Sequence, residues 1–126
     1  MFTGIVAGTY EVSQVSLSEN LQKLIVKTPE SFTKQLQIGA SIAINGTCLT
    51  VTQQNQIANQ VEISFDIIEE TTQKTNLSAL KAGDFVNLER SLTFGAEIGG
   101  HMMTGHISTK AKIEKIEKTP GNHIIH

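Results

Sequence analysis

The chain has 126 residues, 39% of them hydrophobic and 17% charged, with a formal net charge of −2, which fits one globular domain of ordinary size. The slightly negative charge argues against a nucleic-acid or anionic-membrane partner, because such partners select basic surfaces, and no apolar run approaches the roughly 18 residues of a membrane span. The single cysteine, Cys48, excludes an internal disulfide, and the first residues lack a basic stretch followed by a long apolar run, so we expect a cytoplasmic protein.

Strand patterns dominate the first forty residues. Residues 4–15 are rich in β-branched side chains and alternate in part, and residues 21–29 predict a second strand after a turn at 16–20. Residues 31–40 are expected to connect this strand to the next one, with room for one helical turn.

Residues 41–51 read SIAINGTCLTV and predict a β-hairpin. The dipeptide Asn45-Gly46 favours a type I′ turn, in which both central residues have positive φ. Such a turn sets the register of the two strands, and the expected pairs are Ser41 with Thr50, Ile42 with Leu49, Ala43 with Cys48 and Ile44 with Thr47.

The two faces of this hairpin differ in chemistry, because side chains alternate along a strand. One face is large and apolar and is expected to join the core; it holds Ile42, Ile44, Leu49 and Val51. The other face holds only small or polar side chains, those of Ser41, Ala43, Cys48 and Thr50. Three interpretations of this second face stay open: contact with a flat heteroaromatic ligand, cover by another element of the protein, and exposure of a Thr-rich strand to solvent.

Two further strands and a short helix are predicted next. Residues 60–70 alternate cleanly, residues 84–92 also have a strand pattern, and Thr75 or Asn76 is a candidate N-cap for a short helix over 77–80. Five or six short strands separated by turns favour a small closed barrel over a sheet with alternating strands and helices.

The Gly-rich residues 94–101 are interpreted as a linker, and the sequence after them repeats the N-terminus. Residues 102–116 align with residues 1–15 without a gap. The matched positions are Met1/Met102, Thr3/Thr104 and Gly4/Gly105, with apolar character shared at Val6/Ile107, Val12/Ile113 and Val15/Ile116. This pattern predicts an internal repeat whose second copy begins near residue 102.

Motifs for metal and cofactor binding are missing. His101 and His106 are five positions apart with no cysteine or acidic cluster beside them, so no metal site is expected. No phosphate loop or dinucleotide fingerprint occurs. Cys48 is not part of a Cys/His motif, which favours a packing or ligand-lining role over a nucleophilic one.

Taken in order, five segments resemble the first half of the riboflavin synthase family: MFTGIV, GASIAINGTCLTV, SFDIIEETTQKTNL, GDFVNLERSL and EIGGHMMTGHI. The resemblance implies an all-β fold, a six-stranded Greek-key β-barrel with short helical turns. It also implies that residues 1–97 form an N-terminal lumazine-binding barrel, and that residues 98–126 are a linker and the incomplete start of a second lumazine-binding repeat.

The resemblance further implies an activity. Members of the family have two such barrels in tandem and convert two molecules of 6,7-dimethyl-8-ribityllumazine into riboflavin and 5-amino-6-ribitylaminouracil, without a metal or organic cofactor. The reaction takes place where the N-terminal barrel of one chain meets the C-terminal barrel of another. We therefore expect a homo-oligomer, a trimer for a full two-barrel protein and a dimer for this chain, and we expect these residues alone to bind ligand but turn it over poorly.

The site residues implied by the resemblance come from four segments. Substrate-binding positions are Gly4, Ile5 and Val6; Cys48, Leu49 and Thr50; Asp66, Ile67, Ile68, Glu69, Glu70 and Thr71; and Gly105, His106 and Ile107. His106 is a candidate for proton transfer, since imidazole titrates near neutrality. Cys48, Ser41 and Thr50 are candidates to activate or replace the nucleophile that adds to the acceptor ring.

Three function classes remain in competition. The first is riboflavin synthase, a transferase; the second is a lumazine- or flavin-binding protein without turnover, and such relatives tend to lose the TCLTV and GGHMMTGH residues that this chain keeps. The third is a generic oligonucleotide-binding barrel, which the 5% aromatic content and the negative charge disfavour, because single-strand binders stack bases on aromatics in basic grooves.

Overall fold

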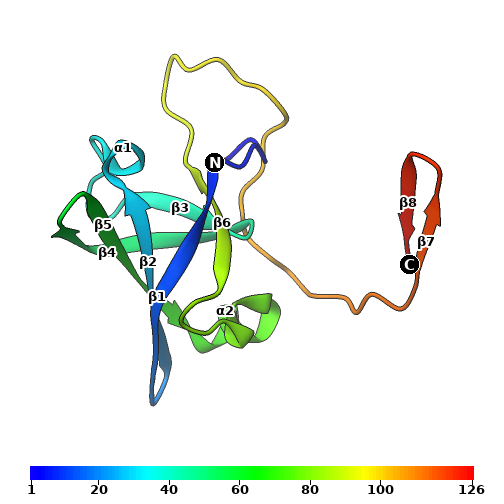
Figure 1. The fold of residues 1–126 in the computed structure, drawn as a ribbon, viewed down its shortest axis with the longest axis horizontal. Coiled ribbons are helices and arrows are strands. Elements are labelled where there is room, and N and C mark those ends of the chain that lie inside the picture. Colours follow the sequence, from blue (N-terminus) through cyan, green and yellow to red (C-terminus); the bar gives the residue numbers. More distant parts are fainter.

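The computed structural model describes residues 1–126 and shows a closed barrel of six antiparallel strands (Figure 1). The strands are β1 (Gly8–Ser18), β2 (Leu21–Pro29), β3 (Ser41–Ile44), β4 (Thr47–Ile57), β5 (Gln60–Ile68) and β6 (Phe85–Arg90), and their order around the barrel is β1-β2-β5-β4-β3-β6. Hairpins join β3, β4 and β5, while β2 lies beside β5, which is a Greek-key arrangement. The predicted fold class is confirmed.

Three short helical elements cross the barrel ends. α1 (Glu30–Thr33) follows β2, while α2 (Glu69–Lys74) and the 3₁₀-helix η1 (Asn76–Ala79) join β5 to β6. The predicted cap is confirmed at Thr75, whose hydroxyl accepts a hydrogen bond from the Leu77 N–H at 3.3 Å. None of these helices is long and apolar enough to cross a membrane.

Several predicted strand boundaries were wrong. The first strand begins at Gly8 instead of residue 4, because the Glu89 carboxylate accepts hydrogen bonds from the backbone N–H groups of Thr3 and Gly4. It then runs through the expected turn to Ser18. β5 stops at Ile68, and the next two residues, both glutamates, begin α2, where negative charge suits a helix N-terminus.

The 41–51 hairpin has the predicted register. Asn45 and Gly46 have φ of +48° and +83°, as a type I′ turn requires, and all four expected pairs form between β3 and β4. Its apolar face lies in the barrel core, where Ile42 and Ile44 are fully buried. Most of that core comes from inward-facing strand residues, among them Val12, Leu24, Val26, Val51, Ile63, Phe65, Val86 and Leu88.

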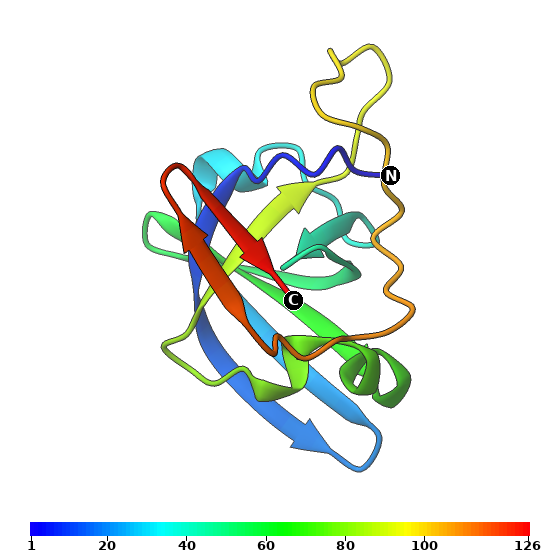
Figure 2. The same cartoon turned by 90° about the vertical axis from the view of Figure 1, so that its right-hand side faces the viewer.

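A second hairpin, β7 (Ile116–Thr119) and β8 (Asn122–Ile125), follows a long segment without regular structure. It stands apart from the barrel in Figure 1, and Figure 2 views the molecule from the hairpin's side. Its register copies that of β1 and β2: Ile116 pairs with Ile125 as Val15 pairs with Leu24. Each residue lies 101 positions after its counterpart, the same offset as in the sequence repeat.

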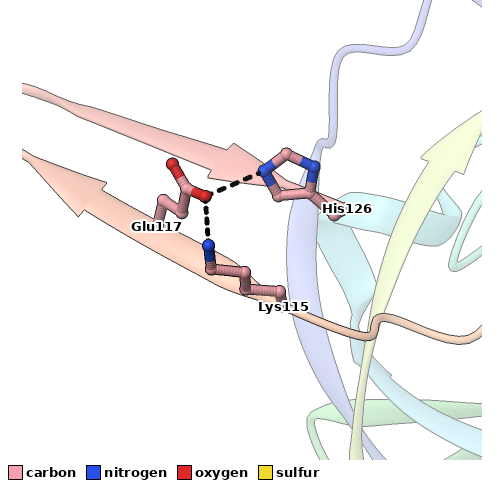
Figure 3. Close-up of polar contacts among 3 residues, drawn as sticks. All are labelled: Lys115, Glu117 and His126. Carbon is pink, nitrogen blue, oxygen red and sulfur yellow. Dashed lines mark hydrogen bonds and ion pairs between the residues drawn. The ribbon is translucent and has the colours of Figure 1, made fainter.

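The two faces of the second hairpin carry different chemistry. On one face, the Glu117 carboxylate pairs with the Lys115 ammonium, and the same carboxylate oxygen lies 3.5 Å from Nε2 of His126 (Figure 3). Ile116 and Ile125 lie on the opposite face and are 50% and 62% exposed. Leu24, the counterpart of Ile125, is completely buried in the first barrel, so this apolar face matches the core face of β1–β2.

Candidate ligand-binding site

The barrel wall opens between β4 and β5. The pairing of these strands ends at Val51 and Phe65, although both strands continue beyond that point. The first residues of β4 stay paired with β3, and the last residues of β5 stay paired with β2. The two strands therefore diverge and leave backbone groups on their facing edges without a ladder partner.

Part of this opening is bridged by the start of the second repeat. The Cys48 N–H, which faces the opening, donates a hydrogen bond to the Gly105 carbonyl at 2.9 Å. Gly105 has φ of +76°, and a Cβ built on it would lie 2.9 Å from the Cys48 Cβ. Only glycine fits such a close approach at positive φ.

The small face of the 41–51 hairpin is covered by protein only in part. Ala43 is buried, and Ser41 and Cys48 are half-buried. Thr50 is exposed. Cover by another element, one of the three interpretations left open by the sequence, therefore accounts for the part of this face near Cys48, where Gly105 lies.

A cavity of about 420 Å³ lies beside Cys48, between β4, α2 and residues 105–107. Seven of the predicted site residues line it: Cys48, Ile68, Glu70, Thr71, Gly105, His106 and Ile107. The structure thus brings together the hairpin, the residues after β5 and the GHI segment. A larger groove of about 620 Å³ beside α1 has only one hydrophobic lining residue, so it suits a flat aromatic ligand less well.

Three lining residues were not predicted: Thr47, Lys74 and Thr75. Lys74 and Thr75 reach the cavity because α2 turns the chain, which places positions 70, 71, 74 and 75 on one side. A helical pattern over 69–74, with two acids first and a lysine last, could have revealed them.

The other predicted residues lie elsewhere. Leu49 and Ile67 belong to the barrel core, with exposed fractions of 6% and 1%. Ser41, Thr50 and Asp66 do not line the cavity; Thr50 and Asp66 are exposed, and Ser41 is half-buried in its pair with Thr50.

Four further predicted residues lie away from this cavity, and three of them line other hollows. Glu69 lines a separate hollow beside the β1–β2 turn. Ile5 and Val6 line another hollow, against the end of β6. Gly4 donates its N–H to Glu89 and contacts Met103.

Glu70 and Lys74, which both line the cavity, form an ion pair. The Lys74 ammonium lies 2.6 Å from a Glu70 carboxylate oxygen, one helical turn away on α2. The hydrogen bond from Lys74, and then its positive charge, hold the pKa of Glu70 below its usual value. The His106 ring has no hydrogen-bonding or ion-pair partner; its backbone N–H donates to the Thr104 hydroxyl at 3.2 Å. No group of three metal-ligating side chains is present.

Comparison with known proteins places the chain in a family. Residues 3–91 match the family model described as the lumazine binding domain. The chain belongs to the lumazine-binding domain family. It is 45% identical over 125 residues to riboflavin synthase of Escherichia coli strain K12, covering 99% of this chain and 57% of that relative. The chain thus spans little more than half the length of this curated relative.

Solved structures agree with this assignment. The crystal structure of LumP complexed with riboflavin matches with a TM-score of 0.80 and 26% identity, over 99% of this chain and 65% of that chain. LumP complexed with 6,7-dimethyl-8-(1'-D-ribityl) lumazine matches with a TM-score of 0.79 and 26% identity, over 99% of this chain and 67% of that chain. The resemblance inferred from the sequence is confirmed: the chain is a riboflavin synthase-like or lumazine-binding protein.

Proposed function

We propose that the cavity between β4, α2 and residues 105–107 binds one molecule of 6,7-dimethyl-8-ribityllumazine or riboflavin. The observation that carries this proposal is the diverged β4–β5 edge bridged at Cys48 and Gly105, with the cavity directly beside it. Three of the cavity's ten lining residues are hydrophobic and can contact a flat ring, and the polar ones can serve as the anchors that ligand pockets use to orient a ligand.

The lining suggests how such a ligand is oriented. The flat ring lies against Cys48, Ile68 and Ile107, and the amide edge of the ring hydrogen-bonds to backbone groups left open between β4 and β5. The ribityl chain, a polyol, points toward the hydroxyl and charged groups of α2. Ser41, Thr50 and Asp66 extend the polar surface next to the ring.

We infer that the chain is the N-terminal part of a riboflavin synthase. In this proposal residues 1–97 are the first lumazine-binding barrel, and residues 98–126 are the linker and the start of the second. The common register of β7–β8 and β1–β2 supports this division, as does the similarity to the longer Escherichia coli enzyme.

The proposed reaction needs two lumazines held face to face. One of them loses a proton from its acidic C7 methyl group, and the other accepts a nucleophile before the four-carbon unit is transferred. Positioning of two reactants can supply about 7–11 kcal/mol of such a barrier. His106 is the proposed proton-transfer group, and Cys48, Ser41 and Thr50 are proposed to assist the adding nucleophile. No metal or organic cofactor is needed for these steps.

The second lumazine is proposed to lie on a barrel of another copy, which makes the active protein a homo-oligomer. The cytoplasm remains the predicted location. A second candidate function, lumazine or flavin binding without turnover, is favoured by the likeness to LumP at a TM-score of 0.80. In that alternative the cavity holds the same ligand but no transfer follows.

Two measurements test these proposals. Titration of the protein into riboflavin should quench the flavin fluorescence with a saturable curve. Riboflavin formed from 6,7-dimethyl-8-ribityllumazine by a chain that continues into a second barrel would then favour the synthase, whereas binding without turnover would favour the alternative. No change in fluorescence at any protein concentration would refute both.

A further inference from the structure

The cavity holds two residues of opposite charge, and they pair with each other. Glu70 and Lys74 both line the cavity, and their side chains are joined at 2.6 Å. Glu70 is the only acidic residue among the lining residues, and Lys74 is the only lysine or arginine. A ligand entering the α2 side of the cavity therefore meets a carboxylate and an ammonium that is already paired.

This arrangement discriminates between two chemical forms of the ligand. A ribityl hydroxyl is neutral and can donate a hydrogen bond to Glu70, whose second carboxylate oxygen makes no hydrogen bond within the protein. A phosphate ester on the same chain carries about −1.5 to −2 charges at neutral pH. Because this charge is negative, Glu70 repels the phosphate, and Lys74 must leave Glu70 to bind it.

We propose that Glu70 makes this site selective for unphosphorylated riboflavin over riboflavin 5′-phosphate, by occupying Lys74 and by repelling the phosphate. The proposal rests on the function proposed above, since it needs the ring to lie at Cys48 and the ribityl chain to point toward α2. Lys74 is the only lysine or arginine that lines the cavity, so no second cation offsets the effect. The lowered pKa of Glu70 keeps its carboxylate ionised at neutral pH.

Specificity of this kind is a difference between two affinities, and in this proposal Glu70 is the repulsive element for a phosphate and Lys74 the attractive one. Glu70→Gln removes the negative charge, keeps the shape of the side chain and frees Lys74 for a phosphate. Because Glu70 is mostly exposed, the gain should be moderate: about fivefold in the ratio of the two affinities, the upper end for an exposed charge pair.

The experiment measures the dissociation constants of riboflavin and riboflavin 5′-phosphate by fluorescence titration at low salt. The unmodified protein should bind riboflavin more tightly than its phosphate, and Glu70→Gln should shift the ratio toward the phosphate. Adding Lys74→Met to Glu70→Gln should remove that shift. Glu62→Gln is the matched control, because it makes the same charge change on β5, six residues before Ile68 and about 20 Å away along the strand.

Each outcome bears on the proposal. Equal affinity of the unmodified protein for the two flavins would overturn it, and so would equal shifts in Glu70→Gln and Glu62→Gln. A shift that persists after Lys74→Met would overturn the role given to Lys74. Failure of the unmodified protein to bind either flavin is a different result: it removes the proposed ligand site itself, and this inference with it.

Discussion

Phe2 and Met103 pair across the molecule as an antiparallel bridge, each donating its backbone N–H to the other's carbonyl, at 2.8 and 2.9 Å. They are also equivalent positions of the sequence repeat, 101 residues apart. Two equivalent segments that bond to each other reciprocally are related by a local two-fold axis. This relationship explains why the second repeat reaches back onto the first barrel, where Gly105 contacts Cys48.

The first prediction concerns Phe2, one of the two residues of this bridge. Phe2 is 1% exposed, so Phe2→Ala should destabilise the protein by about 3–5 kcal/mol, the usual range for a buried phenylalanine. The free energy of unfolding in urea checks this value. Phe94→Ala is the matched control, because Phe94 is fully exposed and its loss should change stability little. Equal effects of the two substitutions would show that Phe2 is not packed as described.

The second prediction separates backbone strain from close contact at Gly105. Gly105→Ala and Gly95→Ala both place a side chain at positive φ, but only residue 105 has other atoms within 4 Å of the new Cβ. Crowding against Cys48 should add about 1–3 kcal/mol to the shared strain. We expect Gly105→Ala to weaken riboflavin binding measured by fluorescence, and Gly95→Ala to leave it unchanged. Similar riboflavin affinities in both variants would contradict the contact between residues 105–107 and the ligand.

The third prediction tests the apolar wall of the cavity. Ile68 lines the cavity and is 54% exposed, so Ile68→Ser should lower riboflavin affinity without a comparable loss of stability. Loss of this contact with the ring corresponds to about 1–2 kcal/mol. Ile57→Ser, at the far end of β4 and 47% exposed, is the control. If both variants bind riboflavin as the unmodified protein does, the ring does not lie against Ile68.

The fourth prediction is self-association. Ile5 and Val6 are 55% and 48% exposed. In the sequence repeat they correspond to His106 and Ile107, which line the cavity of the first barrel. We expect residues 1–126 to form a homodimer that riboflavin strengthens, and Ile5→Asp to weaken it. Sedimentation at low and high concentration, with and without riboflavin, measures the state. A monomer under all these conditions would refute the prediction.

The fifth prediction concerns turnover. Residues 1–126 hold one barrel and one extra hairpin, so two copies offer their lumazines in the same role, whereas the proposed transfer needs a donor and an acceptor. A misplacement of about 1 Å can already reduce a rate a hundredfold. Riboflavin formation at equal site concentration should therefore be at least about a hundredfold slower than in a chain extended by a second barrel. Equal rates would contradict the two-barrel mechanism.

Several features of this protein could be predicted from the sequence because they depend on neighbouring residues. Asn45-Gly46 selects a turn, the turn sets the register, and the alternation of side chains then assigns Ile42 and Ile44 to the core. The Thr75 cap is equally local. The internal repeat could also be recognised in the sequence, since both copies specify the same hairpin register at a constant offset of 101 residues.

Tertiary structure decided where the cavity lies and which of the predicted residues line it. No local pattern indicates that the pairing of β4 and β5 stops at Val51 and Phe65, because residues 47–50 of β4 are held by β3 and residues 66–68 of β5 by β2. The hydrogen bond between Cys48 and Gly105 joins residues far apart in the sequence, so it depends on the path of the chain. Lys74 shows both kinds of cause: one helical turn of α2 carries the lysine to Glu70, which is local, but only the path of the chain brings α2 beside residues 105–107.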